Sequence, residues 1–175
     1  MNIALLLEMA AEAAPDRVGL VCEGKRWTYG ELLGAARGAY ELIVESKAQY
    51  VALLDESSEA ALIAVFGAAL AGVPYCPLNY RLPDADLAAL LDRIAPALVI
   101  GDVQRVSRLA ADQGHTILSR EDFTVKAQDT APPEGGREYD SGEGVAIQLF
   151  TSGTTAAPKA AILRHSNLIG YILGT

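Results

Sequence analysis

Cysteine is scarce in this chain, which has two in 175 residues, Cys22 and Cys76. Both lie in apolar runs, and neither belongs to a Cys-x-x-Cys or Cys/His pattern with the spacing of a metal site. Neither a disulfide framework nor a zinc site therefore has support. We expect two buried thiols in a reducing compartment and no metal ion held by this chain.

Basic residues are also few, because 14 lysines and arginines face 22 aspartates and glutamates, which gives a formal net charge of −8. Proteins that bind nucleic acid or anionic lipid gain much of their affinity from Lys and Arg side chains that neutralise phosphates. The sequence therefore predicts no nucleic-acid partner.

Long apolar runs are missing as well, since none reaches the roughly 18 residues that a membrane-spanning helix needs. Glu8 and Glu12 interrupt the apolar N-terminus, which also lacks the basic start of a signal peptide. We therefore expect no transmembrane segment and a cytoplasmic location. A content of 51% hydrophobic and 21% charged residues is typical of a folded globular domain.

What the chain does contain is an alternation of short apolar strands and longer helical segments. Strands are expected at residues 50–54, 73–78, 97–100, 115–118 and 145–150, and helices at residues 3–14, 28–46, 57–72, 84 onward and 103–113. Residues 17–22 and 26–28 predict a hairpin. This alternation is typical of βαβ units, so we predict an α/β fold with a mostly parallel sheet and flanking helices.

Several residues have predicted structural roles in these elements. Thr28 and Glu31 have the spacing of a capping box, in which each side chain accepts a hydrogen bond from the other residue's backbone N–H. Asn2 and Asn167 are expected at helix starts, and Gly72 at a point of close packing. A core position and the wall of a pocket are both open for Tyr75, Cys76 and Tyr80.

Composition divides the chain into three parts. Residues 1–125 are expected to form an N-terminal α/β lobe. Residues 126–144 are polar, rich in Pro and Gly and without periodicity, which predicts a surface loop or a linker. Residues 145–175 are expected to hold a strand, a loop and a helix that begins at about Ser166.

The segment that follows this last strand concentrates groups that can bind phosphate. Residues 151–159 contain four hydroxyls, one glycine and one lysine, and no acidic residue occurs from Gly144 to Thr175. Hydroxyls and loop N–H groups donate to phosphate oxygens, and a Lys ammonium neutralises them. Lys159, Arg164 and His165 make this end of an acidic chain cationic. An anion-binding loop and an ordinary turn both fit this composition.

Three well-known motifs are excluded for this segment. A Walker loop requires Gly-Lys followed by Ser or Thr, whereas Pro158 precedes Lys159 and Ala160 follows it. The dinucleotide fingerprint Gly-x-Gly-x-x-Gly is absent too. Without the Gly-x-Ser-x-Gly of a nucleophile elbow, Ser152 is a poor candidate for a nucleophile.

Residues 150–163, FTSGTTAAPKAAIL, resemble the phosphate-binding signature of the adenylate-forming superfamily, which includes acyl-CoA synthetases, peptide-synthetase adenylation domains and luciferases. Three further segments carry the same resemblance in the order found in the family: WTYGEL at 27–32, AALAGVPYCPLN at 68–79 and RHSNL at 164–168. The whole chain is therefore similar to the N-terminal portion of these enzymes.

The resemblance implies the N-terminal subdomain of an enzyme that uses Mg-ATP to activate a small carboxylic acid as an acyl-adenylate and transfers it to CoA. ATP, Mg²⁺ and CoA are thus the implied cofactors and co-substrates. No catalytic residue is expected in this chain, because the family's other nucleotide-binding segments and its catalytic lysine would lie beyond residue 175. We interpret the chain as a fragment that does not turn over alone. By the resemblance, the β- and γ-phosphates of ATP are bound by Thr151, Ser152, Gly153, Thr154, Thr155 and Lys159.

Three functions remain open. An acyl-CoA ligase, above all one for fatty acids, is preferred because residues 14–20, APDRVGL, are similar to many fatty-acyl and aryl ligases. An amino-acid or aryl-acid adenylation domain shares that feature. A catalytically silent nucleotide-binding or scaffold module of the same fold is the third alternative.

The signature departs from the family pattern at Ala156 and Ala160, where glycine is usual. Either the backbone has negative φ at both positions and phosphate binding survives, or the loop is strained and nucleotide affinity is lost. We prefer the first account because Gly153 and Lys159 are retained.

The C-terminal residues predict an exposed apolar surface, which would promote association such as a homodimer. Its expected members are Leu168, Ile169, Tyr171, Ile172 and Leu173.

Overall fold

The computed structural model describes residues 1–131, 143–151 and 159–174. Its elements, in chain order, are α1 (Ala4–Ala13), β1 (Val18–Cys22), β2 (Lys25–Thr28), α2 (Tyr29–Glu45), β3 (Tyr50–Leu54), α3 (Glu59–Ala71), β4 (Tyr75–Pro77), α4 (Asp84–Arg93), β5 (Ala97–Gly101), α5 (Val103–Leu109), β6 (Thr116–Leu118), α6 (Arg120–Asp129), β7 (Val145–Thr151), β8 (Lys159–Arg164) and α7 (His165–Gly174). None of the helices described is long and apolar enough to span a bilayer.

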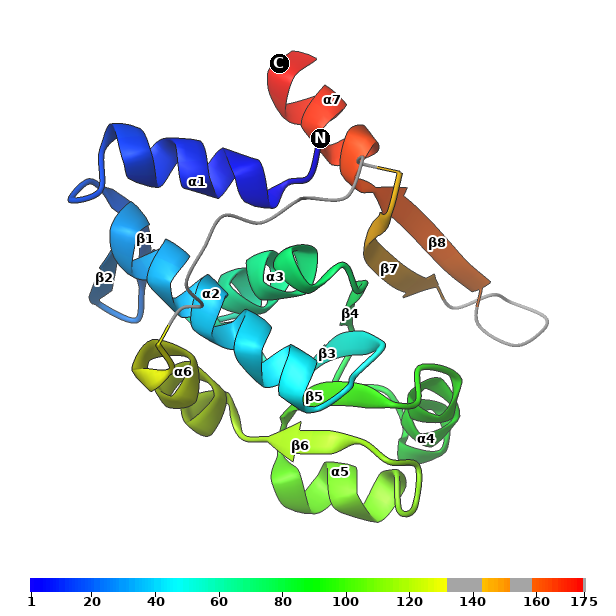
Figure 1. Ribbon diagram of the computed structural model, residues 1–175. Helices are drawn as coiled ribbons and strands as arrows, with labels where there is room; N and C mark the ends of the chain where they lie inside the picture. Colours follow the sequence, from blue (N-terminus) through cyan, green and yellow to red (C-terminus); the bar gives the residue numbers. More distant parts are fainter. Residues whose placement is uncertain (132–142, 152–158, 175) are drawn as a thin grey trace.

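Six of these strands form one sheet, in the order β6-β5-β3-β4-β7-β8 (Figure 1). The strands from β6 to β7 are parallel to their neighbours, and β8 runs antiparallel to β7. β1 and β2 form a separate antiparallel hairpin, as the sequence predicted. The expected α/β fold with a mostly parallel sheet and flanking helices is therefore confirmed.

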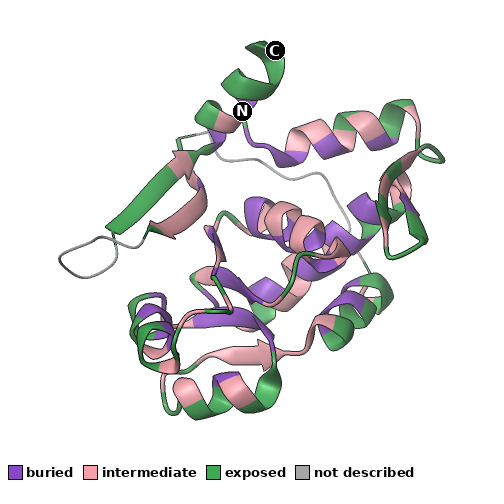
Figure 2. Cartoon of the chain, turned by 180° about the vertical axis from the view of Figure 1, so that it is seen from behind, coloured by how far each residue is buried: buried purple, intermediate pink, exposed green. Residues whose placement is uncertain are grey.

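The central strands are buried on both faces, as Figure 2 shows for the middle of the sheet. Val51 and Leu53 of β3 pack with α2, α3 and α6, whereas Ala52 and Leu54 pack with α4 and α5. β5 alternates in the same way. Burial on both faces explains why these strands read as unbroken apolar runs rather than as alternating patterns.

The start of α2 confirms the predicted capping box. The Thr28 Oγ1 accepts a hydrogen bond from the Glu31 backbone N–H at 3.2 Å, and the Glu31 carboxylate accepts one from the Thr28 N–H at 2.8 Å. These two bonds satisfy backbone donors that the first turn of a helix leaves without a partner.

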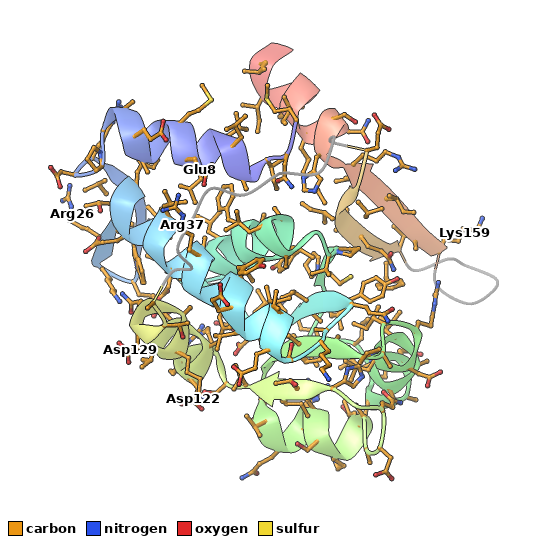
Figure 3. All side chains as sticks on the ribbon, in the orientation of Figure 1. Glu8, Arg26, Arg37, Asp122, Asp129 and Lys159 are labelled. Atoms are coloured by element: carbon orange, nitrogen blue, oxygen red, sulfur yellow. The ribbon has the colours of Figure 1, made fainter. Side chains whose placement is uncertain are left out.

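Asn2 was expected to be the N-cap of helix α1, but Ile3 holds that position. The Asn2 Oδ1 still accepts from the Ala4 N–H at 2.9 Å at the start of the helix. Further along α1, Glu8 forms a salt bridge of 3.0 Å with Arg37 of α2 (Figure 3).

The role expected for Gly72 was wrong. Its φ is +70°, and a Cβ there would meet no described atom within 4 Å, so Gly72 ends α3 as a left-handed cap. Close packing occurs at Gly67 instead, where a Cβ would lie 2.8 Å from the Cβ of Ala39 in α2.

Helix α6 corrects the prediction of a loop or linker from residue 126, because it continues to Asp129. The Ser119 hydroxyl caps its start by accepting from the Asp122 N–H at 3.0 Å. Phe123 and Ala127 are buried against α2 and α3 in the core. So few apolar residues in a polar segment give no helical periodicity, which is why the helix was missed. The remainder of the expected loop, residues 132–142, lies outside the described residues.

Smaller differences concern element ends and one thiol. α5 ends at Leu109 rather than near Gln113, and positive φ at Asp112 and Gly114 turns the chain toward β6. Cys76 is buried as expected, but Cys22 is only half-buried at the edge of the β1–β2 hairpin.

Helices α2 and α6 approach closely at Gly38. A Cβ at Gly38 would lie 1.9 Å from the carbonyl oxygen of Ala127, which is too close for any side chain. Only glycine therefore allows α6 to lie at this distance from α2.

We predict that Gly38→Ala lowers the free energy of unfolding by about 1–3 kcal/mol, because the methyl group forces the two helices apart. Gly34→Ala in the same helix is the control, because a Cβ there meets no described atom within 4 Å. It should raise stability by up to about 1 kcal/mol through helix propensity. Urea unfolding monitored by circular dichroism measures both, and a Gly38→Ala protein as stable as the wild type would contradict the packing of α6.

Arg105 of α5 holds the start of α4. Its guanidinium donates to the Asp84 carboxylate at 2.7 and 3.0 Å and to the carbonyl oxygens of Tyr80 and Leu82 at 2.8 and 3.3 Å. The hydrogen bond from Arg105 is the main reason why the pKa of Asp84 lies below its usual value, and Arg108 contributes less.

We predict that Arg105→Ala costs about 1 kcal/mol of stability at pH 7 through the bonds to the two carbonyls. Arg108→Ala, which removes a more exposed contact with the same carboxylate, should cause no measurable change. The folded-state pKa of Asp84 is depressed, so its contribution is complete above the ordinary pKa of 3.8 and is lost as pH falls below it. The gap between the urea midpoints of wild type and Arg105→Ala should therefore narrow at acidic pH without closing, because the bonds to the two carbonyls remain. A gap that does not change with pH would contradict the role of Asp84.

Candidate phosphate-binding site

The candidate site begins at the loop end of the β7–β8 hairpin, where residues 152–158 connect the two strands. Thr151, the last residue of β7, pairs with Lys159, the first residue of β8, and the Thr151 hydroxyl donates to the Lys159 carbonyl at 3.3 Å. The structure therefore brings together the first and last members of the expected phosphate-binding set. The other four, Ser152, Gly153, Thr154 and Thr155, lie outside the described residues, as does Ala156.

Lys159 is the cation that this end of the hairpin presents to solvent. Both Thr151 and Lys159 are exposed, and the Lys159 side chain projects away from the body of the molecule (Figure 3). Among the residues described, no salt bridge involves Lys159. Its ammonium can therefore neutralise an anion that approaches the hairpin.

The two other residues of the expected cationic surface, Arg164 and His165, do not share that position. Arg164 lies at the opposite end of β8, where its guanidinium donates to the carbonyl of Glu143. His165 is 1% exposed, and its Nδ1 accepts from the backbone N–H of Ile3 at 3.4 Å. The expected cationic surface is thus reduced to Lys159 at the loop end of the hairpin.

The place of Thr151 in the sheet suits ligand binding. β7 is parallel to β4, so Thr151 lies at the edge of the sheet where the parallel strands have their carboxyl ends. Ligands of open α/β sheets bind outside this edge. Hydroxyl and ammonium groups there can bind a polyanion electrostatically, without forming a covalent bond.

Ala160 stands in strand β8, where it pairs with Phe150 of β7. The extended backbone of a strand is open to alanine without strain, and Ala160 is not among the described non-glycine residues with positive φ, which are Glu23, Lys47 and Asp112. At this position the structure supports the account in which alanine is tolerated.

A cavity of about 590 Å³ opens at the same edge, at the ends of β3, β5 and β6. Tyr80 lines it, whereas Tyr75 and Cys76 belong to the core, where burial raises the pKa of the Cys76 thiol to about 12. The cavity wall carries Arg105, which Asp84 already engages, and it includes no residue of β7 or β8. Among the described residues, the cavity and the two strands of the hairpin are therefore separate features.

Sequence reasoning assigned Asn167 to the start of the last helix, and its Oδ1 accepts from the Arg164 N–H at 2.9 Å, which confirms that role. It missed the buried contact of His165, whose partner lies 162 positions away in the chain. The only signal in the sequence was the position of His165 within the RHSNL segment.

Comparison with known proteins shows which family the chain belongs to. Residues 7–175 match the model of the AMP-binding enzyme family. The chain is 30% identical over 170 residues to N-(5-amino-5-carboxypentanoyl)-L-cysteinyl-D-valine synthase of Amycolatopsis lactamdurans, with 95% of this chain and 5% of the synthase covered. It is 31% identical over 193 residues to the medium/long-chain-fatty-acid-CoA/3-oxocholest-4-en-26-oate-CoA ligase of Mycobacterium tuberculosis, with 99% of this chain and 35% of the ligase covered.

Among solved structures, the chain is similar to ATP-bound MatB from Rhodopseudomonas palustris, with a TM-score of 0.79 and 27% sequence identity. The match covers 99% of this chain and 37% of MatB. The chain thus spans about a third of the ligase and of MatB. By its sequence over almost its full length and by its fold, the chain belongs to the AMP-binding enzymes and corresponds to the N-terminal portion of an adenylate-forming enzyme.

Proposed function

We propose that this chain is the N-terminal part of an ATP-dependent acyl-CoA synthetase that activates a fatty or other carboxylic acid as an acyl-adenylate and transfers it to CoA. The observation that carries the proposal is the β7–β8 hairpin, which holds Thr151 and Lys159 together at the carboxyl edge of the parallel sheet. An exposed ammonium at this edge suits a triphosphate.

In this proposal the triphosphate lies against the hairpin and receives hydrogen bonds from its hydroxyls and backbone N–H groups, while Lys159 neutralises charge. The contribution of this chain is to bind and orient ATP. In this proposal Mg²⁺ arrives bound to the nucleotide. The proposed phosphate-binding residues are Thr151, Ser152, Gly153, Thr154, Thr155 and Lys159.

The acceptor is the part of the proposal that the relatives divide. The relative from Mycobacterium tuberculosis is named as a CoA ligase, and the relative from Amycolatopsis lactamdurans is named as N-(5-amino-5-carboxypentanoyl)-L-cysteinyl-D-valine synthase. An adenylation domain that activates an amino acid is therefore the second candidate. Incubating the full-length protein with ATP, acid and either CoA or a phosphopantetheinylated carrier protein distinguishes them, because only the true acceptor releases AMP.

Other expectations for the whole protein stay predictions. Tyr171, Ile172 and Leu173 are 74%, 52% and 69% exposed, whereas Ile169 is buried, so a smaller apolar surface than expected is available for a homodimer. A cytoplasmic location is likewise proposed. The 175-residue chain should not release pyrophosphate alone, because much of the rate acceleration comes from groups held in the correct orientation by other parts of the enzyme.

We predict that Lys159→Ala lowers kcat/KM for ATP in the full-length enzyme by at least about tenfold, which corresponds to 1.4 kcal/mol. The loss of one ammonium near the triphosphate is the cause. Arg26→Ala is the control because it removes one positive charge from an exposed position in strand β2, on the other side of the molecule (Figure 3). Acid-dependent pyrophosphate release measures both, and equal activity of wild type and Lys159→Ala would refute the proposed role.

We also predict that Ala160→Gly leaves acid-dependent pyrophosphate release within about twofold of the wild type, because the strand conformation at residue 160 does not require glycine. Glycine should instead weaken the hairpin by about 0.5–1 kcal/mol. A gain in rate of about tenfold would show that alanine strains the site. Absence of pyrophosphate release in both proteins, with ATP binding retained, would favour the silent-module alternative.

A further inference from the structure

The β7–β8 hairpin has a short connection to the rest of the sheet. β7 pairs with β4 at Ile147 and Tyr75, whereas β3 and β5 pair at five positions. Thr151 lies six residues beyond Val145, which is about 20 Å along an extended strand. A tilt of about 3° at the base of such a hairpin, where Val145 pairs with Arg164, moves its loop end by about 1 Å. Such a shift is enough to disturb a reacting geometry. What holds the base therefore determines where Thr151 and Lys159 point.

The base is held by the other end of the chain. His165, which directly follows β8, accepts from the Ile3 N–H through Nδ1 at 3.4 Å, and the His165 N–H donates to the Gly144 carbonyl beside β7 at 3.2 Å. Both strands of the hairpin thus meet at one buried histidine. To accept this bond the ring must carry a lone pair on Nδ1 and its proton on Nε2.

Asn2 connects the same point to helix α3. Its side-chain amide donates to the Ala69 carbonyl near the end of α3 at 2.9 Å, and Asn2 is 2% exposed. A separate apolar cluster surrounds these bonds and joins α1, α3, β7 and α7; its members are Ile3, Ala4, Ala69, Ala146 and Ile169. Figure 1 shows the N-terminus beside the first turn of α7.

We propose that Asn2, Ile3 and His165, here called the N-terminal clamp, are positioning residues that fix the direction of the β7–β8 hairpin and thereby present Thr151 and Lys159 to ATP. The proposal rests on the proposed function for its last step and on geometry alone for the first. None of the three residues touches the nucleotide in it. They act through the hairpin.

The arrangement suits this role because the clamp adds hydrogen bonds from the N-terminal segment to α3 and to His165, beside a hairpin that the sheet holds at one residue pair. α3 is packed in the core, so a bond from Asn2 to its Ala69 carbonyl gives the N-terminal segment a rigid reference. The Ile3 N–H then donates to His165 at the base of the hairpin, so the position of the hairpin is tied to that of α3. Loss of one member should loosen the hairpin while the central strands keep their packing.

Hydrogen exchange of the 175-residue chain tests the geometric step whether or not the enzyme assignment holds. His165→Leu removes the acceptor, and His165→Asn keeps one near the position of Nδ1. We expect His165→Leu to raise exchange in residues 145–151 and 159–164 by about tenfold, with β3 and β5 unchanged within about twofold. His165→Asn should restore most of the protection.

His115→Leu is the matched control. His115 also accepts a backbone N–H through Nδ1, from Ala97 at 3.0 Å, but it lies beside β5 and β6, at the other end of the sheet. Its loss should leave exchange in the hairpin unchanged. Asn2→Ala breaks the clamp from its other side and should raise exchange in the same two peptides, which keeps the test decisive if His165→Leu fails to fold.

The link to ATP is tested in the full-length enzyme. We expect His165→Leu to lower kcat/KM for ATP by about tenfold while KM for the carboxylic acid changes less than about twofold. His165→Asn should recover most of the kcat/KM for ATP, and His115→Leu should resemble the wild type. A general loss of stability would not separate the two substrates in this way.

Three results would overturn the proposal. The first is that hydrogen exchange in the hairpin stays unchanged in both His165→Leu and Asn2→Ala. The second is that exchange rises equally over the whole chain in both variants. The third is that kcat/KM for ATP stays unchanged although exchange in the hairpin has risen. If the wild-type enzyme releases no acid-dependent pyrophosphate, the proposed function fails, and the exchange pattern still decides whether the clamp positions the hairpin.

Discussion

Burial of strands β3 and β5 on both faces is the constraint on which the rest of the molecule depends. Parallel strands covered on both sides require helices on both sides, and α2, α3 and α6 occupy one face while α4 and α5 occupy the other. Because the strands are parallel, their carboxyl ends share one edge, where the cavity and Thr151 both lie. The position of the candidate site is therefore a consequence of how the core is covered.

Charge then distinguishes the two features at that edge. The cavity wall mixes Arg120 with Asp55 and Glu121. Burial lowers the pKa of the Arg120 guanidinium, but Asp55, Glu121 and Glu23 together raise it above its usual value. The hairpin, by contrast, belongs to a segment without acidic residues and presents Lys159 to solvent. In a chain of net charge −8, a segment without acidic residues repels a polyanion less than a surface that carries carboxylates.

Local chemistry explains what the sequence could predict. The capping box of Thr28 and Glu31 and the continuous apolar runs of β3 and β5 are encoded within a few residues, so they can be read without a structure. The signature around Thr151 and Lys159 could be recognised for the same reason, although its central residues lie outside those described.

Features that depend on distant parts of the chain could not be read. Phe123 and Ala127 make α6 stable through contacts with α2, and a polar sequence gives no sign of them. Gly38 looks like any helical glycine until the Ala127 carbonyl is placed beside it. The bond between Ile3 and His165 spans almost the whole chain, so the residues that hold the base of the hairpin emerge only from tertiary packing.

The account places the triphosphate of ATP at the loop end of the β7–β8 hairpin. A crystal structure of the full-length protein with Mg²⁺ and a non-hydrolysable ATP analogue tests this most directly. We expect the β- and γ-phosphates within hydrogen-bonding distance of the Thr151 hydroxyl and the Lys159 ammonium. A triphosphate bound elsewhere, such as in the cavity at the ends of β3 and β5, with Lys159 still directed into solvent, would contradict the account.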